Sequence, residues 1–159
     1  MIEVVRAKLA DAPAVCVALR RSIAEVCGSD YSHIEGFVEN WLKNKTPENV
    51  AIWIENPAAY FIIARACNSD IVAGVGSLSR AGEVLLCYVI PEYLGRGVGR
   101  SILEALEMQA LEWGIQRLTT LSTITARDFY ARQGFRPCGS TISESGYEIE
   151  IPMAKEHVI

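Results

Sequence analysis

The sequence predicts a mixed α/β fold of one domain, and three observations lead to that prediction. The chain has 159 residues, close to the ~150 of an average domain, and 50% of it is hydrophobic. Apolar residues recur at helical spacing over the first third of the chain and alternate at strand spacing from Ala59 onward. Helical and strand patterns then follow one another to the C-terminus, so helices should cover a central sheet.

The first third of the chain predicts one strand followed by helices. Residues 2–6 alternate weakly, and Asp11 with Pro13 is typical of a helix start. Val15, Leu19 and later apolar residues then recur at helical spacing. We expect a helix over 12–27 that ends at Gly28, a second over 32–43, and a short third after Pro47.

The rest of the chain predicts most of the sheet. Residues 83–90 are almost wholly apolar, which predicts a central strand buried on both faces and ended by Pro91. Gly114 should end the helix that follows the glycine-rich loop. The remaining strands are expected at 59–67, 71–78, 117–121, 135–139 and 147–153, with helices up to Trp113 and over 123–132. The total is about seven strands.

Charge and composition exclude several classes of protein. There are 15 basic and 19 acidic residues, which disfavours nucleic-acid binding and fits a soluble enzyme and, weakly, a cationic substrate. No apolar run approaches the ~20 residues of a membrane span, and the N-terminus does not resemble a signal peptide, so we expect a cytoplasmic protein. The five cysteines include no CxxC pair, and His33 and His157 show no metal-ligand spacing, so no metal is expected.

The most informative segment is the loop over residues 91–100, in which Gly95, Gly97 and Gly99 alternate. Glycine lets the main chain approach a ligand, and the free N–H groups where a helix begins attract anions, so the loop suits a pyrophosphate, with Arg96 and Arg100 adding charge. The spacing fits neither a Rossmann nor a Walker A motif. The alternative is a tight loop whose glycines serve only packing.

A family resemblance makes this interpretation specific. Residues 83–114, a strand, then V-x-P and the glycine loop, resemble the acetyl-CoA motif of the Gcn5-related N-acetyltransferases (GNATs). The segment 122–135, with A-x-x-F-Y-x-x-x-G-F, resembles the family's next signature, and the ending PMAK is also similar. The resemblance covers essentially the whole chain. It implies a single GNAT domain over 1–159, a mostly antiparallel mixed sheet flanked by helices, and acetyl-CoA as co-substrate.

The resemblance also implies where the cofactor binds. The coenzyme A pyrophosphate should contact main-chain amides of the glycine loop, and the pantetheine arm should pair with the preceding strand like an added strand. Such pairing requires a strand that splays from its neighbour. Leu94 replaces a Gln or Arg of the family, which predicts some loss of affinity. The implied cofactor-binding residues are Cys87, Tyr88, Val89, Leu94, Gly95, Arg96, Gly97, Val98, Gly99 and Arg100.

Three residues take catalytic roles by the same resemblance. The Cys87 N–H should polarise the acetyl carbonyl, while its thiol is expected to pack in the core; the alternative, a covalent cysteine nucleophile, lacks an identifiable His or Asp partner nearby in the sequence. Tyr130 should protonate the leaving thiolate; its alternative is an aromatic on the buried side of a helix. Glu83 should accept the amine's proton through water, since it lies about 13 Å along the strand from Cys87. The alternative for Glu83 is a solvated carboxylate at a strand end.

The acceptor side is less specific. In this fold the acceptor usually lies between the first two helices and the sheet, where a carboxylate with aromatic side chains suits a cation. The alternative is a solvated helix with Trp41 in the core. Thr123 stands where the family often has asparagine, and it receives no role. The residues expected in this region are Asp30, Tyr31, His33, Glu35 and Trp41.

Together these features predict an N-acetyltransferase that passes an acetyl group from acetyl-CoA to a primary amine by direct attack in a ternary complex. The acceptor is a small-molecule amine or a peptide, with no nucleic-acid or membrane partner, and homodimers are common among relatives. Two alternatives stay open. One is an acyl-CoA sensor without turnover, and the other is transfer of a longer acyl group or transfer to a protein N-terminus.

Overall fold

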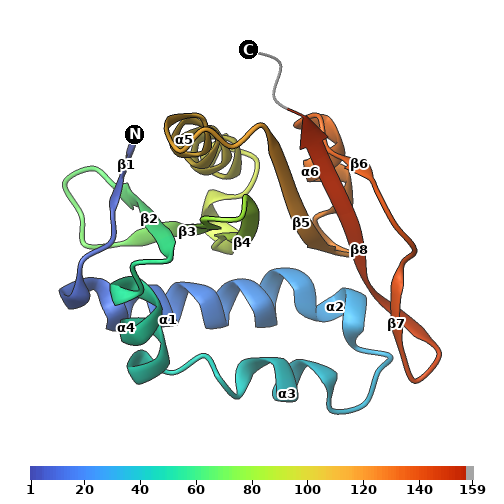
Figure 1. Ribbon diagram of the computed structural model, residues 1–159. Helices are drawn as coiled ribbons and strands as arrows, with labels where there is room; N and C mark the ends of the chain where they lie inside the picture. Colours follow the sequence, from blue (N-terminus) through green and yellow to red (C-terminus); the bar gives the residue numbers. More distant parts are fainter. Residues whose placement is uncertain (157–159) are drawn as a thin grey trace.

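A computed structural model describes residues 1–156 and shows one mixed sheet with helices on both faces (Figure 1). The strands lie in the order β1-β2-β3-β4-β5-β8-β6, and β7 pairs with β8. Only β4 and β5 run parallel; the other pairs are antiparallel. The strands are β1 (Ile2–Arg6), β2 (Ala59–Ala66), β3 (Val72–Ser79), β4 (Glu83–Val89), β5 (Arg117–Thr123), β6 (Arg136–Pro137), β7 (Ile142–Glu144) and β8 (Tyr147–Glu156).

The helices form two layers. In Figure 1 α5 lies above the sheet, and α1, α3 and α4 lie beneath it. A π-helical turn, Ser22–Cys27, continues α1 directly into α2. The helices are α1 (Ala12–Arg21), α2 (Gly28–Tyr31), α3 (Phe37–Leu42), α4 (Pro47–Glu55), α5 (Val98–Glu112) and α6 (Arg127–Arg132).

Strand β2 explains why the two layers have separate cores. Its side chains alternate, so Ile62 and Ala64 join the core between the sheet and α5, while Phe61 and Ile63 join the core between the sheet and the helices α1 and α4. The neighbouring strand β3 has glycine where α5 passes over it. A Cβ at Gly74 would lie 2.6 Å from Ile102 Cδ1, so the missing side chain lets α5 approach the sheet closely.

The structure corrects three predicted helix boundaries. Gly28 does not end the first helix, because it has right-handed helical geometry (φ −54°) and the π-helical turn leads through it to Tyr31. The second helix begins at Phe37 rather than Ser32, since Gly36 interrupts the chain with φ 74°. The helix predicted over 123–132 begins only at Arg127. The short helix after Pro47 is confirmed, with Thr46 Oγ1 accepting from Asn49 N at 3.2 Å.

The structure also corrects two statements about strands. The strand β7 was not predicted; it is short and joins β8 through a turn at Ser145 and Gly146, both with positive φ. Strand β4 is not buried on both faces. Val84 is the one buried residue among its seven, and Leu85 is 46% exposed. The prediction assumed neighbouring strands along the whole length of β4, but β5 pairs with it only at Glu83 and Val84. The strand predicted at 135–139 is reduced to β6.

The described residues contain neither a membrane-spanning helix nor a metal-binding group of side chains. No helix within residues 1–156 is long and apolar enough to cross a membrane. Over the same range, no three His, Cys, Asp or Glu side chains are grouped so that they could hold a metal ion. The prediction for His157 concerns a residue outside the described range.

Candidate active site

The site begins where β4 and β5 separate. These parallel strands pair only at their beginnings, through Glu83 with Thr119 and Val84 with Thr120. Beyond that point β4 pairs only with β3. Ile90 N donates to Ala73 O on that side at 3.0 Å. Because N–H groups alternate in direction along an extended strand, those of Val89 and Cys87 face the open side. The predicted splayed strand with unpaired main-chain groups is therefore present.

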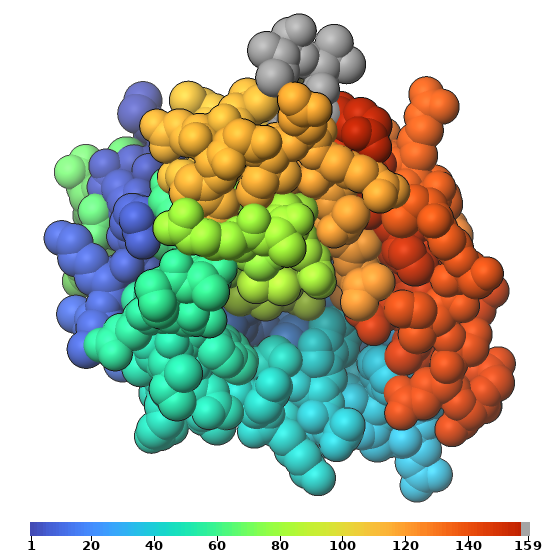
Figure 2. Space-filling view, in the orientation of Figure 1, coloured from blue at the N-terminus to red at the C-terminus, as the bar shows by residue number. Residues whose placement is uncertain are grey.

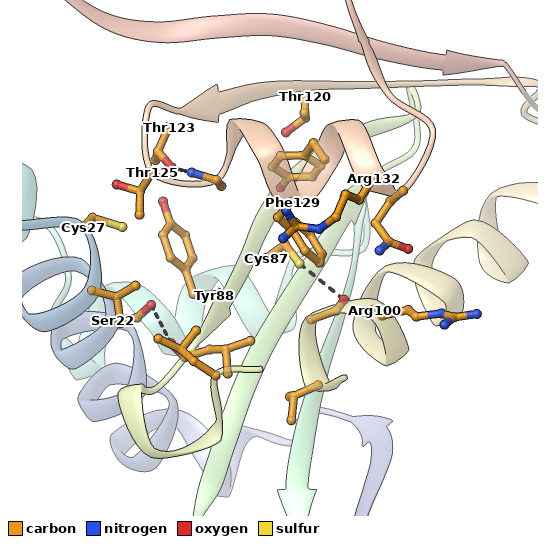
Figure 3. Close-up of a pocket in the computed structure, with 18 of the residues that line it drawn as sticks. Ser22, Cys27, Cys87, Tyr88, Arg100, Thr120, Thr123, Thr125, Phe129 and Arg132 are labelled. Carbon is orange, nitrogen blue, oxygen red and sulfur yellow. Dashed lines mark hydrogen bonds between the residues drawn. The ribbon is translucent and has the colours of Figure 1, made fainter. Parts of the chain in front are cut away.

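A cavity of about 560 Å³ occupies this fork (Figure 3). Its walls come from the open edge of β4, the glycine loop, α6 and the π-helical turn. This volume lies within the range of small-molecule sites. In Figure 3 the Tyr88 side chain points across one end of the cavity toward Thr123 and Thr125.

The three glycines of the loop have different functions. Gly95 (φ 71°) and Gly97 (φ 80°) adopt left-handed geometry, and a Cβ on either would meet no atom within 4 Å. Their main chain is therefore open to a ligand. Gly99 has no positive φ, and a Cβ there would lie 3.1 Å from the Phe129 ring. Packing explains this third glycine, whereas the open main chain at Gly95 and Gly97 leaves the loop accessible to a ligand.

The start of α5 supplies hydrogen-bond donors to the same cavity. Ser101 N makes an early bond of this helix, donating to Gly97 O at 3.0 Å. The N–H groups of the preceding residues, Val98, Gly99 and Arg100, therefore have no acceptor within the helix. Together with the dipole of a 15-residue helix, they favour an anionic group. The loop and the helix start thus fit the pyrophosphate of coenzyme A.

A family model described as an acetyltransferase (GNAT) domain matches residues 27–157. The chain belongs to the GNAT family. This match covers the fork, the glycine loop and α6, while Ser22 and Val26 of the cavity wall lie outside the matched residues.

Relatives agree with this assignment. A GCN5-related N-acetyltransferase structure from Rhodopseudomonas palustris is 25% identical, with a TM-score of 0.84 over 98% of this chain and 95% of that one. The PaiA N-acetyltransferase of Thermoplasma acidophilum, solved with coenzyme A, shares the fold at 20% identity, with a TM-score of 0.82 over 99% of both chains. An amino-acid acetyltransferase of Pseudomonas putida is 43% identical over 61 residues, which are 38% of this chain and only 14% of that relative's length.

Tyr130, on α6, lines the cavity at the fork between β4 and β5. It is 5% exposed and packs edge-on against Phe129 and Phe135. Burial raises its pKa well above the ordinary value of 10.0, the nearby Cys87 adds to the increase, and a hydrogen bond with Thr120 opposes it. The phenol therefore keeps its proton at neutral pH, as an acid must before it acts.

The Cys87 side chain lies in the same cavity. Burial raises the pKa of its thiol to about 12, and its Sγ lies 3.9 Å from Gly99 O. A thiol with so high a pKa holds almost no thiolate at neutral pH. The thiol is therefore protonated, and it packs against the core cluster that includes Tyr130.

Glu83 lies in a second cavity, of about 360 Å³, which adjoins the first. The two cavities share Leu85, Tyr88, Leu121 and Thr123. Tyr31 and Trp41, both expected on the acceptor side, also line the second cavity. Asp30, His33 and Glu35 do not line it. The Asp30 carboxylate accepts from Thr125 Oγ1 at 2.7 Å, and the His33 ring packs against Tyr147.

Most of the predicted cofactor-binding and catalytic residues line the main cavity, the one at the fork, but Arg96 and Glu83 do not. Arg96 does not line the main cavity; its guanidinium lies 5.1 Å from the centroid of the Tyr93 ring. Arg100 lines the cavity, but its side chain pairs with Glu104 at 2.9 Å. The predicted residues that line the main cavity are Cys87, Tyr88, Val89, Leu94, Gly95, Gly97, Val98, Gly99, Arg100 and Tyr130.

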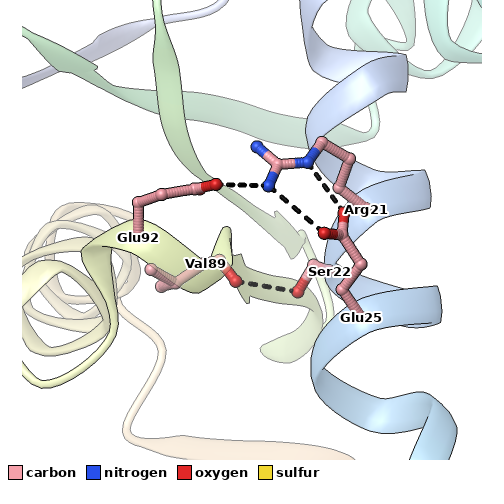
Figure 4. Close-up of polar contacts among 5 residues, drawn as sticks. All are labelled: Arg21, Ser22, Glu25, Val89 and Glu92. Carbon is pink, nitrogen blue, oxygen red and sulfur yellow. Dashed lines mark hydrogen bonds and ion pairs between the residues drawn. The ribbon is translucent and has the colours of Figure 1, made fainter.

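Sequence reasoning missed the wall that the π-helical turn contributes. Ser22, Val26 and Cys27 line the main cavity, and the Ser22 hydroxyl donates to Val89 O at 3.0 Å. Figure 4 shows this bond beside the ion pairs of Arg21 with Glu25 and with Glu92. The pair with Glu92 joins α1 to the segment after β4. Nothing in the apolar periodicity of this segment marks a π-helical turn, whose extra residue shifts the helix faces.

Arg132, the last residue of α6, and Gln133, which follows it, also line the cavity and were not predicted. Gln133 could have been indicated by its position three residues after Tyr130, a spacing at which side chains are neighbours on a helix surface.

Proposed function

We propose that this chain, as a single acyltransferase domain over residues 1–159, transfers the acetyl group of acetyl-CoA to a primary amine. The reaction runs by direct attack in a ternary complex, without a covalent enzyme intermediate. The observation that carries the proposal is the fork between β4 and β5, which opens main-chain donors of β4 into one cavity with the glycine loop.

The proposed reaction proceeds through proton transfers and bond changes in a fixed order. The acceptor ammonium first loses a proton toward Glu83, through water, because an ammonium has no lone pair. Its nitrogen then attacks the thioester carbon, forming the C–N bond, while the Cys87 N–H stabilises the developing oxyanion. The C–S bond breaks, and the leaving thiolate takes the proton of Tyr130. The second proton lost by the nitrogen returns, through solvent, to the Tyr130 phenolate.

The high pKa of Tyr130 fits this role because the thiolate that it protonates would leave inside the same desolvated cavity. The thiol of Cys87, in the same cavity, has its pKa raised to about 12 by burial. A thiolate released there is destabilised by the same desolvation, so it is a stronger base than in water and can take a phenol's proton.

Two relatives support the proposal. The Thermoplasma acidophilum neighbour was solved with coenzyme A, and the Pseudomonas putida relative is an amino-acid acetyltransferase whose similarity covers 61 residues. Both fit a cavity that takes the coenzyme.

The test combines binding with turnover. Calorimetry should show that acetyl-CoA and coenzyme A bind the folded protein. A panel of primary amines should then release free coenzyme A from acetyl-CoA, with one amide formed for each thiol released. Binding without thiol release for any amine would support the sensor alternative, and the absence of binding to folded protein would reject the cofactor site itself. Replacing the acetyl ester with longer acyl esters tests the remaining alternative.

A further inference from the structure

The second cavity is a candidate acceptor site, and its lining has a distinctive charge. It lies among α2, α3, the start of β4 and the β7–β8 hairpin. Figure 2 shows this face, hollowed between the cyan segment of α3 and the green segment that begins β4. Three carboxylates line the cavity: Glu83, Glu144 and Glu150. None of them forms an ion pair with another residue in 1–156.

One cationic residue, Lys45, also borders this cavity, but its ammonium contacts residues outside the lining. Its Nζ donates to Asn44 Oδ1 at 2.8 Å and lies 5.9 Å from the centroid of the Trp53 ring. Neither Asn44 nor Trp53 lines the cavity. Within the described residues, none of the three carboxylates is therefore paired with the Lys45 ammonium.

Two of the carboxylates are close enough to affect each other. Glu150 is half-buried, and burial raises its pKa, with the charge of Glu83 adding to the increase. Carboxylates held together in a partly desolvated place are stabilised by a cation between them.

Aromatic side chains also line this cavity. The ring of Tyr31 stacks on Phe37 at 4.9 Å and meets Trp41 edge-on at 5.5 Å, and all three rings line the cavity. Aromatic faces attract organic cations and also pack against their methylene chains. Tyr31 is fixed in place, because its hydroxyl donates to Ile149 O at 2.6 Å and accepts from Ile124 N at 2.9 Å.

From this lining we infer that the acceptor is a small dication, an alkyl diamine, of which one amine is acetylated while the other, as an ammonium, is held by the carboxylates. The inference rests on the proposed function and names its substrate class. A volume of about 360 Å³ is at the small end of ligand pockets, which suits a short chain. An amino acid fits less well, since its carboxylate would enter an acidic cavity.

The test compares three acceptors of equal length: a five-carbon α,ω-diamine, the matching amino alcohol and the matching ω-amino acid. Initial rates of coenzyme A release from saturating acetyl-CoA give kcat/KM for each. We expect the diamine to exceed the amino alcohol by about tenfold, the lower end of the contribution of a charged hydrogen bond. The amino acid should be the poorest acceptor.

A pair of variants assigns the preference to the cavity. Glu150→Gln should reduce the ratio of diamine to amino-alcohol kcat/KM by about tenfold. Glu148→Gln changes the same strand at an exposed position that does not line the cavity, and should leave the ratio unchanged. Circular dichroism and the melting temperature of each variant verify folding.

The outcomes separate this inference from the proposed function. Equal or better turnover of the amino alcohol or the amino acid overturns the dication while leaving the acetyltransferase intact. A diamine preference that survives Glu150→Gln in a folded variant overturns the assignment to this cavity. Binding of acetyl-CoA with no thiol release for any of the three acceptors, nor for a wider amine panel, rejects the proposed function and this inference with it.

Discussion

Tyr130 is the side chain on which the proposed chemistry depends most directly. Tyr130→Phe keeps the ring and its packing against Phe129 and Phe135 and removes only the hydroxyl. We expect kcat to fall by about 100-fold, the lower end for losing a positioned acid, with acetyl-CoA affinity unchanged. Stopped assays of thiol release give kcat, and calorimetry gives the dissociation constant of acetyl-CoA.

A matched control removes the hydroxyl of a tyrosine outside both cavities. Tyr60 on β2 packs against Trp113 and lines neither cavity, so Tyr60→Phe should keep full turnover. A Tyr130→Phe enzyme with wild-type kcat would reject the acid role and return this residue to a purely structural one.

Cys87 provides a second test at the residue scale. The proposed donor is its N–H, which every residue except proline retains, and its thiol is not ionised at neutral pH. Cys87→Ala should therefore keep kcat within about threefold of wild type, the small cost of a lost buried contact. The same thiol-release assay measures it. A loss of several orders of magnitude in the folded variant would contradict the main-chain role and indicate a covalent one.

At the scale of elements, the sequence predicted the parts of the site that depend on local patterns. The glycine loop, the strand before it and Tyr130 lie together in one cavity, as the family motifs implied. The π-helical turn was not predicted, and Tyr31 and Trp41 are the residues expected on the acceptor side that line the second cavity. This cavity forms where segments far apart in the sequence come together, such as those that hold Trp41 on α3 and Glu150 on β8, and no local sequence pattern indicates that contact.

Gly28 and Gly36 show the limit of reading glycines alone. Both stand where a helix could end, yet only Gly36 has a positive φ, and Gly28 continues the helical path. Because glycine tolerates either geometry, its identity does not decide between them; the packing of Cys27 and Tyr31 on either side, both in one core cluster with Ile149, favours continuation here.

This difference yields a prediction about stability. Gly28→Ala places a Cβ 3.7 Å from Ile23 O, an ordinary contact, within a helical stretch. Alanine is the better helix former, so we expect the free energy of unfolding to rise by about 0.5–1 kcal/mol. Urea denaturation followed by circular dichroism measures the change.

The opposite result is expected on β3. Gly74→Ala places a Cβ 2.6 Å from Ile102 Cδ1 and 3.0 Å from Tyr88 O, beneath α5. Overpacking of this kind should lower the free energy of unfolding by about 1–3 kcal/mol in the same urea experiment. If Gly74→Ala were neutral, or if Gly28→Ala were the more damaging of the two, the described packing of α5 or of the π-helical turn would be wrong.

At the scale of the whole molecule, buried groups that hold their protons gather around the fork. Burial raises the pKa of Cys27 to about 11 and that of Tyr31 and Cys87 to about 12, and it also raises the pKa of Tyr88 and of Tyr130. These residues come from the π-helical turn, α2, β4 and α6. The site therefore joins elements from both halves of the chain in one desolvated region, which makes its protonation a property of the fold.

The raised pKa values in this region predict how the free energy of unfolding depends on pH. In the unfolded chain thiols and phenols lose their protons near their ordinary pKa values of 9.0 and 10.0, whereas in the native protein they keep them. Their contribution to stability is therefore fully present below about pH 9 and is lost as the pH rises toward about 12. We expect the free energy of unfolding to fall by at least about 1.4 kcal/mol between about pH 9 and pH 11, the equivalent of one pKa unit. Urea titrations at each pH measure this fall, and phenolate absorbance in folded wild type and Tyr130→Phe shows whether Tyr130 keeps its proton until unfolding. Constant stability across that interval, or a Tyr130 phenolate in folded protein, would contradict the burial on which the proposed acid depends.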